Sequence, residues 1–279
     1  MDKWKELEFY YADLLRKSDA SERRKLYKEA YSAVAKLRIE DFNCENPQNR
    51  TAGTSDKLTR LFSLMVDKRD RVLEVGCGRG YTCMKLAPYV KSMVGIDVSE
   101  PSIAESRIVL SRGNIKNVEI KLVSAFELVE YFTKDEFNVC LSIDVFEHLH
   151  PDDAKDHLQQ VFQVLKPGGK YIIVTPNRLT GPHDITRDVF PEEREARGFH
   201  LNETTYSEII NIMRAIGFNK FRCFFPLKLP KKNIKLIIVP YNLIIIFESL
   251  YRVFPNLLRF RVLERLIAIH LIAYKPETF

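Results

Sequence analysis

The sequence contains few cysteines, and none of them forms a recognisable pair. No Cys-x-x-Cys spacing occurs, and the five residues are odd in number and scattered over 279 positions. This argues against a disulfide framework and against a cysteine-based zinc site, and it favours a reducing compartment such as the cytoplasm. The cysteines are Cys44, Cys77, Cys83, Cys140 and Cys223.

Long apolar runs are also lacking. In the apolar C-terminal region the longest uncharged run, from Leu236 to Phe247, has 12 residues and contains Pro240. A spanning helix needs about 20 apolar residues. The charged N-terminus, MDKWKELEFYYADLLRK, has no apolar stretch of the kind found in a secretory signal. We therefore expect no membrane-spanning helix.

Excess charge is absent from most of the chain. The segment from Lys228 to Arg265 holds eight basic and two acidic residues, and this difference of six equals the whole net charge of +6. The positive charge is thus a local property of one apolar segment. Its basic residues are Lys228, Lys231, Lys232, Lys235, Arg252, Arg259, Arg261 and Arg265.

Short apolar runs alternate with helical stretches over the central part of the chain. Because each run is apolar enough to be covered on both faces, the pattern predicts a parallel sheet between two layers of helices. The predicted strands are residues 71–76, 92–98, 117–123, 137–143, 170–176, 218–225 and 266–274. The predicted helices lie near residues 80–88, 101–112, 125–132, 152–166 and 203–216.

Residues 1–66 are predicted to form an N-terminal helical cap on a domain of residues 67–279. The first 40 residues indicate one or two helices, with an N-cap at Ser18 or Ser21. The turn-forming stretch 43–54 indicates a loop before another helix. Four tyrosines near helical spacing are expected to pack the helices on the core or to cap a site. They are Tyr10, Tyr11, Tyr27 and Tyr31.

The segment Glu74-Val-Gly76-Cys-Gly78-Arg-Gly80 follows the first predicted strand and precedes a helix. Its three alternate glycines let the backbone turn sharply and approach a ligand closely. Asp97 ends the second predicted strand, where a carboxylate can accept hydrogen bonds from both hydroxyl groups of a ribose or can cap the next helix. The run Leu165-Lys-Pro-Gly-Gly169 is a helix stop before the fifth strand.

Together these residues closely resemble the class I S-adenosylmethionine-dependent methyltransferases over about residues 70–225. The resemblance implies S-adenosylmethionine as cofactor. It also implies a Rossmann-like, doubly wound, seven-stranded sheet that is mostly parallel with an antiparallel last strand. A Rossmann dehydrogenase is the nearest alternative, but its glycine-rich strand usually opens the chain. The residues implied to contact the cofactor are Glu74, Gly76, Cys77, Gly78, Gly80, Asp97, Val98, Ser124, Ala125, Phe126 and Asp144.

The segment after the third strand departs from the family pattern. Relatives often have an aspartate here that contacts the adenine amine, whereas this chain has Ser124, followed by Ala125 and Phe126. Adenine recognition is then expected to rely on backbone groups and on packing by Phe126.

The fourth strand ends in Asp144-Val-Phe-Glu147-His148, which resembles small-molecule methyltransferases of the ubiquinone-biosynthesis type. His148, His183 and His200 follow strands four and five and are candidate general bases. The alternatives are that His148 orients its loop and that the other two are surface imidazoles. In some relatives the acidic-x-x-Glu-His group binds a divalent cation. A loop hydrogen-bond network is an equally good interpretation here, and no metal is assigned.

The sequence favours a small acceptor over a nucleic acid. The fourth strand lacks the Asn/Asp-Pro-Pro-aromatic signature of many nucleobase methyltransferases, and no basic, aromatic-interleaved groove occurs outside the basic segment. We expect methyl transfer to an oxygen or nitrogen nucleophile of a sugar, a lipid-linked intermediate or a secondary metabolite. The alternatives are a protein or nucleic-acid substrate, or a cofactor-binding module without turnover.

Residues 226–265 are predicted to form a basic, apolar, helical insert before the last strand, broken into short helices by Pro230, Pro240 and Pro255. One interpretation is a lid that buries its apolar face on the sheet. The other is a peripheral contact with an anionic membrane surface or an amphipathic substrate.

Overall fold

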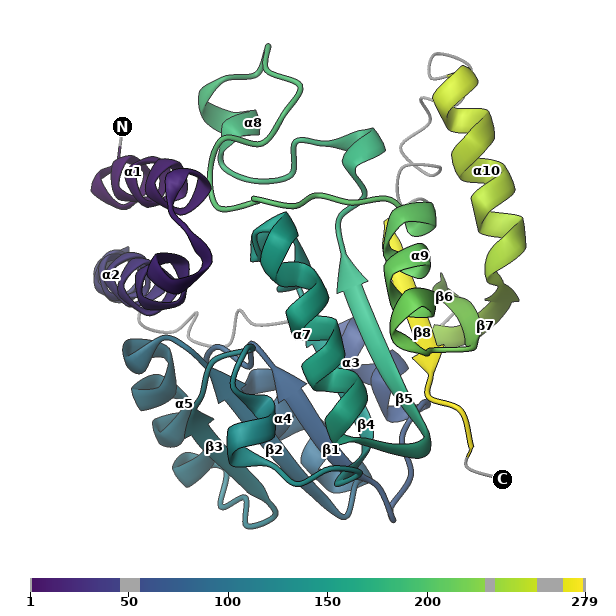
Figure 1. Ribbon diagram of the computed structural model, residues 1–279. Coiled ribbons are helices and arrows are strands. Elements are labelled where there is room, and N and C mark those ends of the chain that lie inside the picture. The colour runs from purple at the N-terminus through teal and green to yellow at the C-terminus, as the bar shows by residue number, and fades with distance from the viewer. Residues whose placement is uncertain (1, 46–55, 229–233, 255–267, 278–279) are drawn as a thin grey trace.

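The computed structural model describes residues 2–45, 56–228, 234–254 and 268–277, and its centre is one twisted sheet (Figure 1). The strands are β1 (Arg71–Val75), β2 (Ser92–Asp97), β3 (Val118–Leu122), β4 (Phe137–Ile143), β5 (Leu165–Thr175), β6 (Lys220–Lys228), β7 (Ile234–Pro240) and β8 (Ile269–Tyr274). They lie in the order β3-β2-β1-β4-β5-β8-β6-β7. Strands β1 to β5 are parallel, whereas β8 is antiparallel to both of its neighbours. The predicted doubly wound sheet with an antiparallel last strand is confirmed.

The predicted count of seven strands is wrong, because the sheet described here has eight. The additional strand, β7, comes from the segment predicted as a helical insert, and it pairs antiparallel with β6 from Arg222↔Pro240 to Lys228↔Ile234. The sequence IKLIIVP is rich in β-branched residues, and β6 offers it an edge with free backbone groups. Only the next part of the insert, α10 (Tyr241–Val253), is helical. Residues 229–233 and 255–267 lie outside the described part of the chain.

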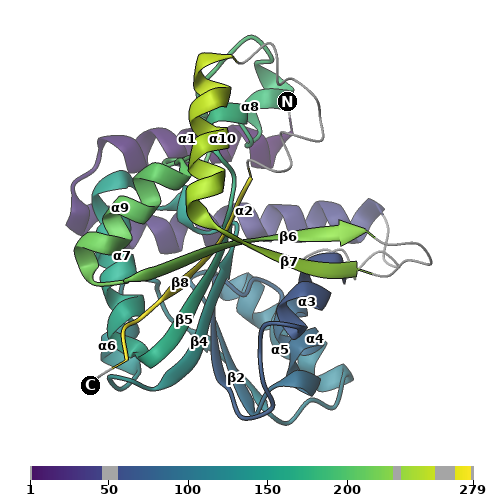
Figure 2. The same cartoon turned by 90° about the vertical axis from the view of Figure 1, so that its right-hand side faces the viewer.

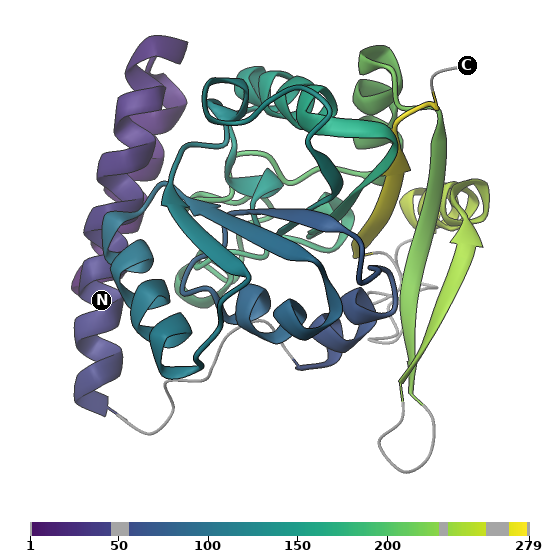
Figure 3. The ribbon, with the colours of Figure 1, turned by 90° about the horizontal axis from the view of Figure 1, so that it is seen from below.

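Helices cover both faces of the sheet (Figure 3). On one face Leu61, Leu86 and Ile103 belong to one buried apolar cluster, and on the other Leu158 and Ile209 belong to a second. Neighbouring residues of β5 alternate between the two clusters, as the period of a strand requires. The first layer holds α3 (Asp56–Ser63), α4 (Tyr81–Leu86) and α5 (Glu100–Arg112), and the second holds α6 (Leu128–Tyr131), α7 (Pro151–Val164) and α9 (Tyr206–Ile216).

Two antiparallel helices, α1 (Lys3–Lys17) and α2 (Ala20–Glu45), lie beside the edge of the sheet where the parallel strands end (Figures 1 and 2). The predicted N-cap at Ser18 or Ser21 is wrong. Asp19 caps α2, because its Oδ1 accepts hydrogen bonds from the backbone N–H groups of residues 21 and 22 at 2.8 and 3.0 Å. The predicted loop at 43–54 begins later than expected, since α2 continues to Glu45.

A buried ion pair fastens α2 to the rest of the molecule. The Arg23 guanidinium donates two hydrogen bonds to the Asp153 carboxylate, at 2.7 and 2.9 Å, and both side chains are buried. The Tyr27 hydroxyl donates to the same carboxylate and accepts from the His150 N–H at 2.7 Å. These contacts position α2 over the end of β4. In the described part of the chain, no helix is long and apolar enough to cross a membrane.

Candidate functional site

A cavity of about 670 Å³ opens where β1, β2, β3 and β4 end, beneath α1 and α2. It is large enough for a nucleotide-sized ligand. Eight of the eleven residues predicted to contact a cofactor line it. These eight are Gly76, Gly78, Asp97, Val98, Ser124, Ala125, Phe126 and Asp144. The site therefore assembles from segments that are adjacent only because their strands are neighbours in the sheet.

The glycine-rich turn after β1 needs its glycines for two different reasons. Gly76 has φ +71° and lies so close to Val145 that an added Cβ would meet the Val145 Cγ2 atom at 2.3 Å. Gly78 has φ +51°, but no atom lies within 4 Å of the position of its missing Cβ. Since Gly78 lines the cavity, a side chain there would enter the space available to a ligand.

Asp97 lies at the end of β2 with its carboxylate held by two backbone N–H groups. Oδ2 accepts from Gly78 at 2.8 Å, and Oδ1 accepts from Ser99 at 2.8 Å. Burial raises the pKa of Asp97 above its ordinary value, although these hydrogen bonds oppose the increase. Each carboxylate oxygen has a second lone pair, so Asp97 can still accept two hydrogen bonds from a ligand.

Three of the predicted cofactor residues do not line the cavity. Glu74 is buried behind it and accepts a hydrogen bond from the Cys83 thiol at 2.9 Å. Burial raises the pKa of Glu74 to about 8. Cys77 is buried between β2 and α4, and Gly80 lies against Ser106 of α5. In this structure, these three residues shape the turn and pack it on the sheet rather than face a ligand.

Ser124 and Phe126 form the side of the cavity that follows β3. The Ser124 hydroxyl accepts a hydrogen bond from the Phe126 N–H at 3.4 Å, so it stabilises its own turn. The Phe126 ring is buried 5.4 Å from the ring of Tyr27, under the Arg24 guanidinium. The wall is therefore aromatic, with Ser124 as its small polar group.

The N-terminal helices supply cavity residues to which the sequence had assigned no definite role. Trp4, Glu8, Tyr31 and Arg38 all line the cavity. The Tyr31 ring lies 4.6 Å from Phe199 and 5.6 Å from His148, and its buried hydroxyl has no hydrogen-bond partner among the described residues. A buried polar atom without a partner is costly, so it marks a place where a ligand can bind.

A second cavity, of about 470 Å³, adjoins the first on the side of β5. Asp144, His183 and His200 line both cavities. Asp144 has φ +51°, which is strained for a residue with a side chain. The backbone adopts this conformation next to the junction of the two cavities. The remaining lining residues are Glu147, Val174, Thr175, Pro176, Thr180, Arg187 and Ala268.

Glu203, which the sequence analysis missed, holds two of the three predicted histidines. Its Oε1 accepts from His200 Nδ1 at 2.8 Å, and its Oε2 accepts from His183 Nδ1 at 3.1 Å. Burial opposes ionisation of Glu203, but the hydrogen bonds from both imidazoles outweigh it and hold its pKa at about 2. The spacing of three residues between His200 and Glu203 was the available signal, although an isolated His-x-x-Glu is common.

The three histidines differ in what they can do. His183 has both ring nitrogens engaged, with Nε2 3.0 Å from the Thr180 hydroxyl. His148 faces a carbonyl oxygen through Nδ1, and burial lowers its pKa to about 3, so it stays neutral. Burial also disfavours charge on His200, but the hydrogen bond to Glu203 and nearby carboxylates raise its pKa above the ordinary value. Because Nδ1 of His200 donates to Glu203, its Nε2 carries the lone pair.

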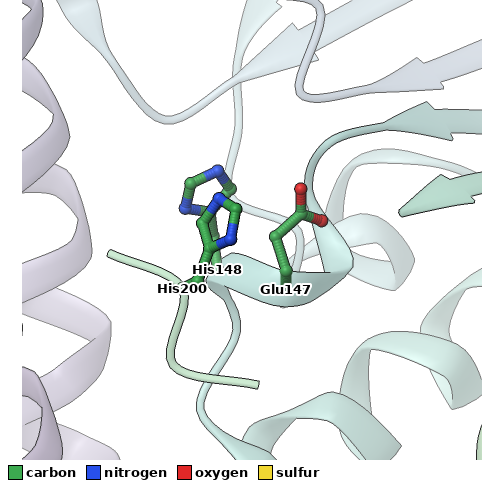
Figure 4. Close-up of side chains that lie close together, drawn as sticks. All are labelled: Glu147, His148 and His200. Atoms are coloured by element: carbon green, nitrogen blue, oxygen red, sulfur yellow. The ribbon is translucent and has the colours of Figure 1, made fainter. Parts of the chain in front are cut away.

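Glu147, His148 and His200 come together at the junction, as Figure 4 shows. Glu147 and His148 belong to the short helix η3 (Phe146–His148), and His200 belongs to the loop before α9. Their potential ligand atoms lie within 4.8 Å of one another. Asp144, which the sequence grouped with Glu147 and His148, is not part of this cluster.

The Glu147 carboxylate is only partly hydrogen-bonded. Its Oε2 accepts from the Thr175 hydroxyl at 2.8 Å, while Oε1 is buried with no hydrogen-bond partner among the described residues. Burial, together with the neighbouring Asp144, raises the pKa of Glu147 to about 8. At neutral pH it is therefore mainly protonated and can donate a hydrogen bond into the junction.

Comparison with known proteins was made by sequence and by fold. The sequence model of the family described as "Methyltransferase domain" matches residues 66–217. A Mycolicibacterium smegmatis protein named "Probable S-adenosylmethionine-dependent methyltransferase" is 29% identical over 150 residues, covering 53% of this chain and 51% of that protein. The ubiquinone biosynthesis O-methyltransferase of Mesorhizobium japonicum is 31% identical over 108 residues, covering 39% and 41%. The chain thus spans about half the length of these curated relatives, or less.

The fold is also found among solved structures. The crystal structure of the YcgJ protein from Bacillus subtilis superposes with a TM-score of 0.53 at 18% identity, covering 80% of this chain and 98% of that one. At this identity the likeness concerns the fold of the sheet and its helices.

Proposed function

The chain belongs to the methyltransferase domain family and uses S-adenosylmethionine as its cofactor, and on this basis we propose that it methylates an oxygen or nitrogen atom of a small molecule. The observation that carries the proposal is the junction of the two cavities at Asp144, His183 and His200. One cavity has the residues that would hold the cofactor. The other gives an acceptor molecule access to the same point.

The larger cavity fits S-adenosylmethionine in its donor set as well as in its volume. Asp97 has two lone pairs left for ribose hydroxyls, and Gly78 leaves open space beside the turn. Phe126 gives an apolar wall on the side after β3. When bound, the cofactor supplies a methyl group activated by its sulfonium sulfur. The chain has to bind it, exclude water and align the acceptor.

An acceptor hydroxyl or ammonium must also lose a proton, and His200 is the residue best placed to accept it. The Glu203 carboxylate fixes the proton on Nδ1 of His200, which leaves Nε2 as the basic atom. Although burial opposes it, the hydrogen bond to Glu203 and the nearby acidic groups raise the pKa of His200, so its neutral imidazole is a stronger base. Burial makes the neutral His148 a much weaker base, so its role is to pack the junction and accept a hydrogen bond.

The size and lining of the second cavity favour a small acceptor. About 470 Å³ is within the range of small-molecule sites, and both apolar and polar side chains line it. Arg187 gives it a cationic wall, which suits an acceptor that carries a carboxylate or phosphate. A sugar, a lipid-linked intermediate and a secondary metabolite all remain compatible with this chemistry.

Two other functions compete with this proposal. A protein or nucleic acid would have to present one residue or base to the junction, and a module without turnover would bind the cofactor alone. The discriminating experiment incubates the chain with methyl-labelled S-adenosylmethionine and size-fractionated cell extract. We expect label in small molecules, and less of it with His200→Ala at unchanged cofactor affinity. Label only in macromolecules, or cofactor binding with no labelled product in any fraction, would reject the proposal.

A further inference from the structure

Helix α10 packs on the protein with its one acidic side chain, Glu248, facing the interior. Glu248 is 1% exposed, and its carboxylate accepts hydrogen bonds from the Asn177 amide at 2.9 Å, the Tyr206 N–H at 2.8 Å and the Ser207 hydroxyl at 2.8 Å. Ile244 is buried on the same face of the helix. These contacts attach α10 to the first turn of α9 and to the loop after β5.

The outward face of α10 is apolar. Six large side chains follow one another at helical spacing, with exposed fractions from 45% for Leu250 to 67% for Val253. Exposed apolar side chains that adjoin one another are typical of an interaction surface. We call these residues the apolar stripe. They are Leu243, Ile246, Phe247, Leu250, Val253 and Phe254.

Two arginines lie near the ends of α10, on the face of Glu248 rather than in the apolar stripe. Arg214 of α9 lies over the ring of Tyr241, the first residue of α10, at 5.0 Å, and Arg252, four residues after Glu248, donates a hydrogen bond to the Thr205 hydroxyl at 3.3 Å. Glu248 is the one acidic residue of the helix, and it faces inward. The chain's whole net charge of +6 lies in the sequence segment that contains this helix. A partner for the stripe should therefore be both apolar and anionic.

We propose that the apolar stripe rests on the surface of an anionic lipid bilayer, to which the positive charge of the segment containing α10 attracts it. Aliphatic and aromatic side chains beside cations are the combination that binds at such an interface. The helix is too short to cross the bilayer, so it would lie along the surface. A second copy of the chain is a poorer partner, because a symmetric contact would bring two like-charged segments together.

The position of α10 relates this surface to the acceptor side of the site. Asn177, which α10 binds through Glu248, follows Thr175 and Pro176 of the second cavity. In Figure 1 the helix rises on the side of the molecule where β5 ends. A lipid surface on the stripe would then lie beside the second cavity, which favours an acceptor carried by the membrane. This last step rests on the proposed function, whereas the docking itself does not.

The test is co-sedimentation of the full chain with vesicles. One set contains phosphatidylcholine alone, and the other also contains about one third phosphatidylglycerol. We expect the protein to pellet with the anionic vesicles at about 50 mM salt. Binding should be at least tenfold weaker at about 500 mM salt and with phosphatidylcholine alone, because the attraction is electrostatic and screened. Equal binding under all these conditions, or none, would overturn the proposal.

A matched pair of variants locates the surface. Ile246→Glu with Phe247→Glu should weaken vesicle binding at least tenfold. Ile108→Glu with Val129→Glu makes the same charge change at exposed apolar residues outside the stripe and should leave binding unchanged. Circular dichroism and S-adenosylhomocysteine affinity check that each variant is folded. Equal vesicle binding by both would place the contact elsewhere, and a wild-type dimer dissociated by the stripe variant would identify a second copy as the partner. A wild-type chain that turns over a small acceptor but binds no vesicles would reject this inference and leave the proposed activity standing.

Discussion

At the scale of single residues, cofactor binding is expected to depend most on Asp97. Its two oxygens are held by the N–H groups of Gly78 and Ser99, so the carboxylate is oriented before a ligand arrives. Asp97→Ala should weaken S-adenosylhomocysteine binding at least about tenfold, or about 1.4 kcal/mol, because ribose hydroxyls lose their acceptor. Isothermal titration calorimetry measures this. Asp97→Asn keeps one acceptor oxygen and should lie between the two. Unchanged affinity in a folded alanine variant would remove the ribose assignment.

Glu203 is a positioning residue whose effect should be visible in the titration of His200. Replacing the carboxylate in Glu203→Gln removes the negative charge that favours the imidazolium, so the pKa of His200 should fall. NMR titration of the histidine rings measures this without an acceptor substrate. The carboxylate would also no longer fix the proton of neutral His200 on Nδ1. We therefore expect kcat to fall at least about tenfold, with a smaller change in KM. A structural role alone would leave the pKa of His200 where it is.

The residues that could be predicted are those whose role depends on a local pattern. Gly78 and Asp97 belong to strand-end motifs, where the covalent sequence itself places the backbone turn and the carboxylate. Glu203 and Tyr31 could not be assigned, because their roles depend on which loop and which helix fold back over the strand ends. For the same reason the sequence offered three equivalent histidines, and only their partners distinguish His200.

At the scale of elements, the predicted strands and helices between β1 and β6 are present because each is apolar at the period of its own structure. The exception in extent is β5, which begins at Leu165, within the run predicted as a helix stop. The segment 234–240 was wrongly predicted as helix. An apolar run of that length suits either state, and the choice depends on the free edge of β6. The interpretation of the insert as a lid assumed that its apolar face would be buried. In the structure, α10 buries Ile244 and Tyr251 beside Glu248 and also exposes the six side chains of the apolar stripe, so only part of its apolar surface is covered.

The attachment of α10 should depend on Glu248. Glu248→Ala would leave the Asn177 amide, the Tyr206 N–H and the Ser207 hydroxyl without their acceptor inside the protein. We expect a loss of about 2–4 kcal/mol in the free energy of unfolding, measured in urea. Ser249→Ala, on the same helix, removes one exposed hydrogen bond and should cost less than about 0.5 kcal/mol. Equal losses in the two variants would mean that the buried carboxylate does not anchor the helix.

At the scale of the whole molecule, the sheet and the N-terminal helices form the cofactor cavity together. Strand ends provide the turn with Gly78 and the carboxylate of Asp97, while α1 and α2 close the cavity with Trp4 and Tyr31. The buried pair of Arg23 and Asp153 connects the two parts. A ligand in this cavity therefore contacts both the N-terminal helices and the strand ends, and its binding should stabilise these two parts together.

This coupling can be measured as a shift in melting temperature. A ligand at about 100 times its Kd adds about 2.7 kcal/mol to the stability of the folded state, which for a chain of this size corresponds to roughly 5 °C. S-adenosylhomocysteine should therefore raise the Tm of the wild type by about that amount.

Gly78→Val should show no such rise, because its side chain would occupy the open space beside the turn and is strained at φ +51°. The variant's own Tm should also fall, because a β-branched residue is strained at a positive φ even though no atom within 4 Å opposes the new Cβ. Gly80→Ala is the control: its φ is also positive, but its added methyl group meets Ser106 instead of the cavity, so its Tm should fall while the ligand-induced rise is kept. A full rise in Gly78→Val would mean that the glycine turn does not contact the cofactor. The loss of the rise in both variants would mean that a positive φ at either position, rather than the open space beside Gly78, is what binding requires.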